Sequence, residues 1–285
     1  MWYSISRARA AICAAVLSAA LAAAFDASNW NPWGEHAEES NRCERPWRPT
    51  SVLREPANAL SNAALVAVAV YCVWPRRADQ RSALPPEVVL VYAMAVWRTA
   101  VGSFWHHACQ CMSGTMADLR ALVGLFGTVL ATTLFAWRRS YTVFVLVVAG
   151  SEVGAAALPL GPNRVLFATG AGMLIAIAGA MTAAAARSAE MRLLNWPEGA
   201  ARGRQRARNL IGRHRQCHGV AAFLAMLVAL GLWLPEEVFG ECVLHDATVS
   251  LHALWHVAAS VALQQHFRFC EGQERRRPPP GRGRV

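Results

Sequence analysis

The chain has 285 residues, of which 55% are hydrophobic and only 16% are charged, and its mean hydropathy is positive at +0.25. Soluble domains carry about 25% charged residues, so this composition argues against an ordinary soluble domain and favours an integral membrane protein. The net charge of +10 is compatible with nucleic-acid binding or with membrane topology, and the positions of the basic residues decide between the two.

In chain order, eight apolar stretches have the length of a membrane span. The first, residues 10–25, follows Arg7 and Arg9 and is short and rich in alanine, as expected of a cleaved signal peptide or a retained anchor helix. The other seven predict spans over residues 57–74, 88–107, 116–136, 142–159, 165–186, 217–234 and 247–267. The sequence therefore predicts an all-α, polytopic membrane protein, with a seven-transmembrane helix bundle preceded by an N-terminal signal or anchor helix.

The arginines test this layout, because cytoplasmic segments of membrane proteins are enriched in them. The predicted cytoplasmic segments hold 21 arginines, whereas the predicted outer segments hold 5. The basic, Pro- and Gly-rich residues 268–285 are predicted to form a disordered cytoplasmic tail. The positive charge therefore reflects membrane topology, and we expect no nucleic-acid partner.

The same topology sorts the eight cysteines of the chain. Cys43, Cys109, Cys111 and Cys242 fall on or near the outer face, where an oxidising compartment permits disulfides. Four cysteines allow three pairings, and the sequence alone leaves all three open.

Polar side chains concentrate at the outer ends of three predicted spans. Ser103 and His107 lie one helical turn apart at the end of one span, and Asp118 lies near the start of the next at nearly the same depth. His252 and His256 form another i, i+4 pair in the last span. An ionisable side chain inside a span costs roughly 2.5–3.5 kcal/mol on insertion scales, so these residues are expected to face the bundle interior and are functional candidates.

Three imidazoles with one open coordination position are the ligand set with which zinc activates water, and a nearby carboxylate can then accept the proton. His107, His252 and His256 are the candidate ligands, and Asp118 is the candidate base. The alternative is that these residues form interhelical hydrogen bonds that hold the bundle together. The His-x-x-x-His spacing lacks the glutamate of the soluble metalloprotease motif, so that class is not indicated.

Other histidines carry weaker predictions. His214 and His218 are also four residues apart, but their arginine-rich surroundings oppose metal binding. His245 and Asp246 precede the last span and form either a solvated loop pair or contacts that orient the ligands. His106 faces about 100° away from its neighbouring ligand on a helix and is interpreted as a lipid-interface or packing residue.

Arg98 and Glu152 are isolated charges deep within two predicted spans. Burying either one unpaired is expensive, so we expect that they, or Arg120, pair within the bundle. A structural role is the first interpretation, and a proton path or a contact to a substrate headgroup is the alternative. His36 and His266 follow no spacing pattern.

Three separated blocks of the sequence match one family in order. They are Cys43-Glu44 followed by Glu55-Pro-Ala-Asn58-Ala-Leu-Ser61-Asn62, then Gly102-Ser103-x-x-x-His107 with Asp118, and finally His252-Ala-Leu-Trp-His256. Together they resemble the alkaline ceramidases and their superfamily of seven-span membrane hydrolases. The resemblance extends from about Asn41 to His266, and its ordered combination is more specific than any single block.

The resemblance implies a seven-helix fold in which His107, His252 and His256 hold a zinc ion, and a water attacks a lipid amide carbonyl. Asp118 would be the general base and then the general acid. Ser103 would position the water or stabilise the oxyanion that forms at the carbonyl. The products from ceramide would be sphingosine and a fatty acid.

The family also has a calcium site just before its first core span. By position, the side chains of Asn41, Glu44 and Glu55 and the backbone carbonyl of Arg42 would be its ligands. This sequence departs from the family there, because Asn41 replaces an aspartate and Pro46 stands where an asparagine ligand is expected. These departures remove one charge and one oxygen donor from a hard-cation site. In the alternative, the two glutamates form salt bridges with nearby arginines.

A family disulfide would map to Cys43 and Cys242, which leaves Cys109 and Cys111 without an assigned partner. Neither the resemblance nor the spacing identifies the lipid pocket or the oligomeric state.

The sequence thus predicts four segments. They are a signal peptide or anchor at 1–25, an outer segment with the calcium site at 26–56, a hydrolase domain at 57–267 and a tail at 268–285. The predicted protein is a zinc amidase of a bacterial inner membrane that takes a ceramide-like lipid from the bilayer into a site near the periplasmic face. The alternatives are a hydrolase of another lipid amide or ester, a heptahelical receptor-like protein with a structural metal, and a metal-free scaffold.

Overall fold

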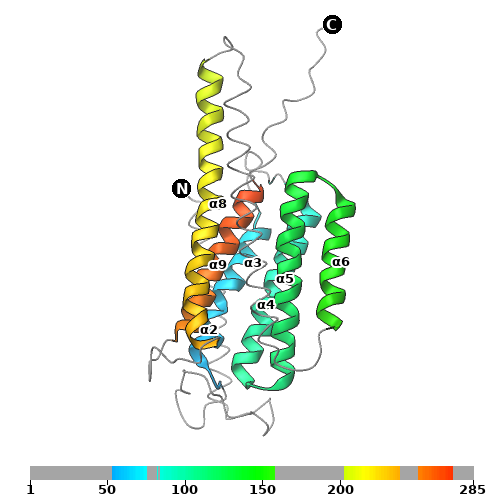
Figure 1. Ribbon diagram of the computed structural model, residues 1–285, viewed down its shortest axis with the longest axis vertical. Coiled ribbons are helices and arrows are strands. Elements are labelled where there is room, and N and C mark those ends of the chain that lie inside the picture. Colours follow the sequence, from blue (N-terminus) through cyan, green and yellow to red (C-terminus); the bar gives the residue numbers. More distant parts are fainter. Residues whose placement is uncertain (1–52, 76–81, 83, 158–201, 238–249, 272–285) are drawn as a thin grey trace.

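The computed structural model describes residues 53–75, 82, 84–157, 202–237 and 250–271, and these residues form helices and connections without a strand (Figure 1). The helices are α2 (Pro56–Ser61), α3 (Ala63–Val73), α4 (Pro86–Cys109), α5 (Met112–Arg138), α6 (Tyr141–Ala157), α8 (Arg202–Glu237) and α9 (Leu251–Glu271). Within this part of the chain, the stretches long and apolar enough to cross a membrane are Pro56–Val73, Pro86–Cys109, Ser113–Arg138 and Cys217–Pro235. The chain is therefore an all-helical integral membrane protein.

Local sequence explains where several helices begin and end. Pro56 and Pro86 lie in the first turns of α2 and α4, where the missing N–H costs no hydrogen bond. At the end of α4, Gln110 has a φ of 51°, a left-handed conformation that closes the helix. Ser250 precedes α9, and its hydroxyl accepts a hydrogen bond of 3.0 Å from the backbone N–H of Ala253, which is an N-cap interaction.

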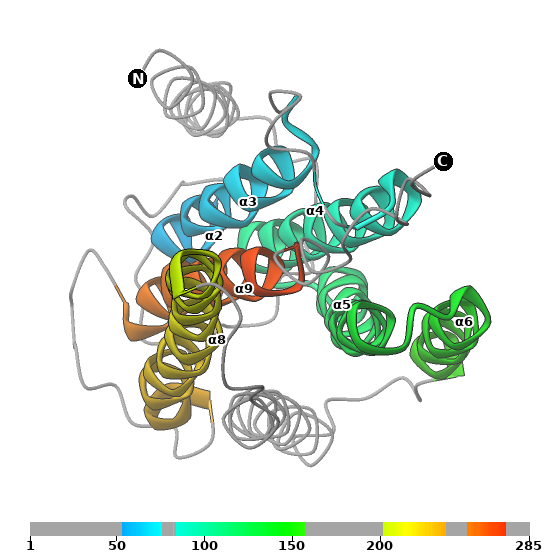
Figure 2. The same ribbon diagram turned by 90° about the horizontal axis from the view of Figure 1, so that it is seen from above.

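The helices pack around α9, which contacts α2, α3, α5 and α8 (Figure 2). Helix α4 packs against α2, α3 and α5, and α6 packs on the other side of α5. The largest buried apolar cluster in the described residues joins α3, α4, α5 and α9. Among its members are Leu65, Val68, Val88, Val96, Leu125, Val129 and Phe267.

Four of the predicted spans, at 57–74, 88–107, 116–136 and 217–234, agree closely with the membrane-length helical stretches. Helix α6 corresponds to the prediction at 142–159 but belongs to the shorter apolar helices. The predicted spans at 10–25 and 165–186 lie outside the described residues.

Helices α8 and α9 differ in extent or composition from the spans that the sequence predicts. Helix α9 corresponds to the predicted span 247–267. It is less apolar than the membrane-length stretches, because its inner face carries histidines and other polar residues. Helix α8 begins at Arg202, fifteen residues before its predicted span, since the basic segment continues the helix beyond the apolar part. This extension rises above the other helices in Figure 1.

Two glycines on the inner faces of α4 and α5 permit close helix packing. A Cβ atom at Gly102 would lie 2.9 Å from the backbone oxygen of Ala117 and 3.2 Å from the Cα atom of Asp118. At Gly124 a Cβ atom would overlap the side chains of Arg98 and Glu152. Only glycine therefore fits against the backbone at position 102, whereas a side chain at position 124 would displace Arg98 and Glu152.

The predicted pairing of the two isolated charges is confirmed. Arg98 on α4 and Glu152 on α6 form a bidentate ion pair, with nitrogen to oxygen distances of 2.6 and 2.7 Å, that passes over Gly124 of α5. The side chains are 43% and 40% exposed in the described part of the chain. The pair links α4 to α6 across α5, which agrees with the structural interpretation.

A second polar group joins α4, α5 and α9 near the C-terminal end of α9. It consists of Tyr92, Thr133, His266 and Cys270 and is called the inner cluster below. The Nδ1 atom of His266 lies 3.1 Å from the hydroxyl of Tyr92, and its Nε2 atom lies 2.9 Å from the hydroxyl of Thr133. The Cys270 sulfur is 3.4 Å from the same Nε2 atom. His266 is thus central to a buried network, although its sequence position follows no pattern.

Candidate metal centre

Three histidines converge at the other end of α9. His107 comes from the last turn of α4, and His252 and His256 come from the first two turns of α9. The ring centroids of these residues lie 4.8 to 5.1 Å apart, and all three side chains are buried. One nitrogen of each ring lies within 4.8 Å of the others. The i, i+4 spacing in α9 and the packing of α4 against α2 and α3 thus bring the predicted imidazoles together.

A buried carboxylate contacts the first of these imidazoles. Glu55 Oε2 accepts a hydrogen bond of 2.6 Å from His107 Nδ1, and both side chains are 0% exposed. The same oxygen accepts a hydrogen bond of 3.0 Å from the side-chain amide of Asn58. The backbone N–H of Glu55 also donates to the carbonyl of His107, so the residues before α2 are fixed to the end of α4.

Two hydroxyls contact opposite nitrogens of His256. Ser61 Oγ lies 2.6 Å from Nδ1, and Ser103 Oγ lies 3.2 Å from Nε2. Ser61 is the last residue of α2, whereas Ser103 lies one turn before His107 on α4. The predicted site serine therefore contacts one of the three imidazoles, at its Nε2 atom.

Asp118 is half-buried on α5 next to the α4 residue that precedes Ser103. The close contact at Gly102 sets this position, because the backbone of Asp118 passes within 3.2 Å of the place where a Cβ atom of residue 102 would be. The helix pairing thus puts the aspartate at the depth that the sequence predicts.

The donor set fits a metal ion. Three buried nitrogen ligands of this kind are typical of zinc sites that keep one position for water. Ligand histidines commonly donate their second ring N–H to a carboxylate or another acceptor, which fixes the ring, and Glu55 and Ser61 make such contacts here. The three histidines can therefore hold one metal ion.

Comparison with known proteins gives the family. The ceramidase family model matches residues 34–274, which is most of the chain and includes every predicted site residue. The chain belongs to the ceramidase family. Among curated proteins, none matches it. The family assignment supports hydrolysis of ceramide and thus an amidohydrolase, and it agrees with the resemblance identified in the sequence blocks.

In this ceramidase-family chain, several predicted residues lie outside the described part. They are the calcium ligands Asn41, Arg42 and Glu44, the disulfide partners Cys43 and Cys242, and the loop pair His245 and Asp246. The fourth calcium candidate, Glu55, is described, and its carboxylate contacts His107 and Asn58. Calcium binding and the 43 to 242 disulfide therefore stay predictions.

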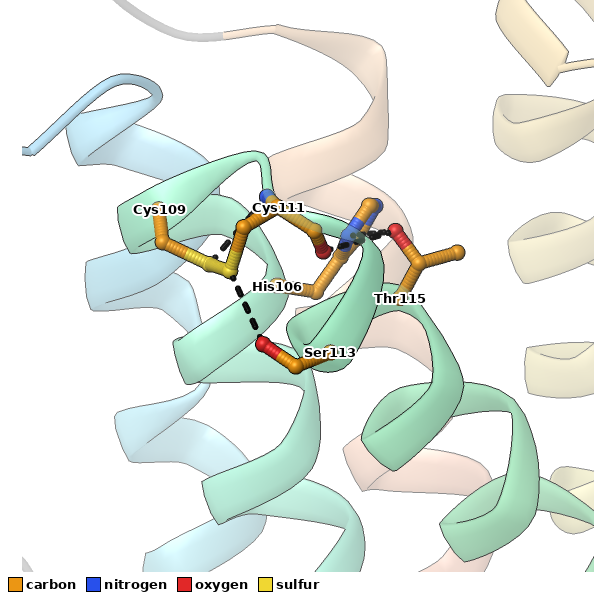
Figure 3. Close-up of a disulfide and its surroundings, with 5 residues drawn as sticks. All are labelled: His106, Cys109, Cys111, Ser113 and Thr115. Carbon is orange, nitrogen blue, oxygen red and sulfur yellow. Dashed lines mark hydrogen bonds between the residues drawn. A yellow bond between two sulfur atoms is a disulfide. The ribbon is translucent and has the colours of Figure 1, made fainter. Parts of the chain in front are cut away.

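Cys109 and Cys111 form a disulfide with each other at the turn between α4 and α5 (Figure 3). The sulfur of Cys109 packs on Gly114, where a Cβ atom would lie only 2.9 Å away. Next to it, Thr115 Oγ1 donates its proton to the carbonyl of Cys111 and therefore accepts a 3.0 Å hydrogen bond from His106 Nδ1. His106 is buried, so its interpretation as a packing residue is confirmed and that as a lipid-interface residue is wrong.

Sequence reasoning missed Glu55 and Ser61, which contact two of the imidazoles, and Asn58, which hydrogen-bonds to both of them. Glu55 was expected to bind calcium or arginine, and Asn58 and Ser61 had no assigned role. A signal was present, because these three polar residues are spaced by three positions at the start of an apolar span. His218, which the sequence analysis considered an unfavourable metal ligand, donates a 2.6 Å hydrogen bond from Nδ1 to the side-chain oxygen of Gln265 on α9.

Proposed function

We propose that the protein is a zinc-dependent intramembrane amidase that hydrolyses ceramide-like lipids to a sphingoid base and a fatty acid. The observation that carries this proposal is the buried group of His107, His252 and His256 in a chain of the ceramidase family. In this proposal the three imidazoles hold zinc, which would supply a Lewis acid for the lipid carbonyl and lower the pKa of water.

The remaining steps fall to residues of the chain. The carboxylate of Asp118 takes the proton from the attacking water and then delivers it to the amide nitrogen as the C–N bond breaks. The hydroxyl of Ser103 donates a hydrogen bond to the negative charge that develops on the carbonyl oxygen. Its distance of 3.2 Å from His256 Nε2 supports a position beside the reacting atoms.

The membrane setting is part of the proposal. The site lies where α4 ends and α9 begins, at one end of the bundle, and the arginine distribution assigns this end to the extracytoplasmic side. A lipid substrate would enter from the outer leaflet. The seven spans and the N-terminal signal or anchor helix belong to the same proposal, with the four membrane-length stretches as partial support.

The experiment that tests this function compares purified wild type with His252→Ala and Asp118→Ala. Zinc content and hydrolysis of a fluorescent long-chain ceramide are measured on the same samples. We expect about one zinc per wild-type chain, weaker zinc binding in His252→Ala, and zinc retention in Asp118→Ala with turnover roughly 10²- to 10⁴-fold lower.

His218→Ala is the matched control, because it removes an imidazole from a helix contact away from the three ligands. It should retain zinc and turnover. If wild type holds zinc but cleaves no lipid amide, the amidase proposal fails and a structural metal takes its place. If wild type holds no zinc and cleaves ceramide, the family activity stands and the metal assignment fails.

A further inference from the structure

The short helix α2 packs against the metal centre on the side opposite to Ser103, and its hydrogen bonds define the protonation of one ligand. Ser61 Oγ donates its single proton to the backbone carbonyl of Asn58, at 2.8 Å. With that proton committed, Ser61 Oγ can only accept in its 2.6 Å contact with His256 Nδ1. His256 Nδ1 therefore carries a proton and donates it to Ser61.

The consequence for the other nitrogen follows from the chemistry of a neutral imidazole. When Nδ1 carries the proton, Nε2 has a lone pair and can bind a metal ion. The hydroxyl of Ser103 lies 3.2 Å from Nε2, and hydrogen-bond donation from Ser103 agrees with this tautomer. The contact with Ser61 thus assigns the state of the ring, and the contact with Ser103 is compatible with it.

Asn58, whose carbonyl accepts the proton of Ser61, is itself held in place by two further hydrogen bonds. The Asn58 carbonyl that fixes Ser61 also accepts a 3.0 Å hydrogen bond from the side chain of Asn62. The side-chain oxygen of Asn58 accepts a short hydrogen bond from Ser250, which caps the helix that carries His256. Since α2 and α9 are joined at this point, Ser61 has a defined position relative to the imidazole.

We propose that Ser61 is a positioning residue of the metal site, whose hydroxyl holds His256 with its proton on Nδ1 and its Nε2 toward the ion. This inference deepens the proposed function and rests on it. Without Ser61 the ring loses its acceptor, so both the ring orientation and the tautomer become free to change. Outer contacts of this kind typically contribute a factor of roughly 10 to 100 in metal affinity.

The test measures zinc affinity by competition with a chromophoric chelator, and steady-state ceramide hydrolysis, in the full-length protein. Ser61→Ala removes the acceptor, and Ser61→Thr keeps a hydroxyl at the same position. Ser151→Ala is the matched control, because Ser151 makes the same hydroxyl bond to the carbonyl three residues earlier on α6, which does not carry the metal ligands. We expect zinc affinity to fall roughly 10- to 100-fold in Ser61→Ala alone.

A coupling measurement separates positioning from a general loss of stability. In a His256→Ala background, adding Ser61→Ala should change zinc affinity no further, because the two residues act through one contact. Turnover of Ser61→Ala should return toward that of wild type at saturating zinc. If Ser61→Ala does not fold, Ser61→Cys replaces it, since a thiol fills the space but accepts hydrogen bonds weakly.

The outcomes distinguish this inference from the proposed function. If purified wild type holds no zinc, both the zinc-dependent function and the role of Ser61 are wrong. Wild type that binds zinc and cleaves ceramide, together with unchanged zinc affinity in Ser61→Ala, would overturn the role of Ser61 alone. Equal loss of affinity in Ser61→Ala and Ser61→Thr would also overturn it, because the hydroxyl would not be the cause.

Discussion

The two ends of α9 each bury imidazole, yet they use it differently. In the inner cluster, both ring nitrogens of His266 contact hydroxyls of other helices, from Tyr92 and Thr133. At the metal-site end, three imidazoles converge as possible ligands of one metal ion. Glu55 also contacts His107, and Ser61 of α2 contacts His256.

This difference teaches that burial alone does not identify a functional histidine. His266 and His256 are 5% and 1% exposed and lie on the same helix. Hydroxyls of neighbouring helices contact both ring nitrogens of each residue. What separates the two residues is that His256 converges with two further imidazoles as possible metal ligands. Changes at the metal-site end should therefore alter zinc binding or turnover, whereas changes in the inner cluster should alter stability.

Among variants that leave the candidate ligands and Asp118 in place, the largest effect on turnover should come from Gly102→Ala. The added Cβ would lie 2.9 Å from a backbone oxygen of α5, so α4 and α5 must separate and move Asp118 away from Ser103. A misplacement of about 1 Å can cost about 100-fold in rate, and ceramide hydrolysis measures it, with zinc content unchanged. Gly150→Ala is the control, since nothing lies within 4 Å of that position. Equal activity in both variants would contradict the role of this contact.

Glu55→Gln should lower the zinc affinity more than it lowers the rate of ceramide hydrolysis. The amide keeps the size of the side chain but removes the negative charge that His107 contacts at 2.6 Å, so zinc affinity should fall roughly 10- to 100-fold. Competition with a chelator measures this change. The exposed residue Glu87 on the first turn of α4 gives the control Glu87→Gln. Unchanged affinity in Glu55→Gln would show that the carboxylate does not orient the ligand.

A smaller effect on turnover is expected when the 109 to 111 disulfide is removed. Replacing both cysteines by serine loosens the turn between α4 and α5, which leads from His107 to Asp118, so kcat should fall less than in Gly102→Ala while zinc stays bound. Dithiothreitol should lower the kcat of wild type at least to this level. Cys217→Ser, at an exposed free thiol, is the control. A wild-type kcat that resists complete reduction of this disulfide would contradict the prediction.

His266→Phe should leave the zinc affinity and ceramide turnover at wild-type values. Phenylalanine keeps the stacking on Tyr92 but removes the hydrogen bonds to two hydroxyls, which should lower the free energy of unfolding by about 1–3 kcal/mol. Unfolding in detergent measures this loss. A large fall in zinc affinity here would break the distinction between the two ends of α9.

The sequence predicted the elements that depend on local pattern. Apolar length identified the helices, and i, i+4 spacing identified His252 with His256 and Ser103 with His107. The positions of Glu55 and Ser61 could not be predicted this way, because their partners are 52 and 195 residues distant and depend on how α2 packs against α4 and α9. The Cys109 to Cys111 pairing was one of several choices that spacing left open. His266 has no repeat or motif, and only helix packing shows its two partners.

The bridge between Arg98 and Glu152 has a consequence for how the protein is assembled. Helix α4 enters the bilayer before α6 exists, so Arg98 has no carboxylate partner during early synthesis. Inserting such a charge costs roughly 2.5–3.5 kcal/mol, and the cost is offset only when Glu152 arrives more than fifty residues later and closes over Gly124. The ion pair therefore couples the stable insertion of α4 to that of α6.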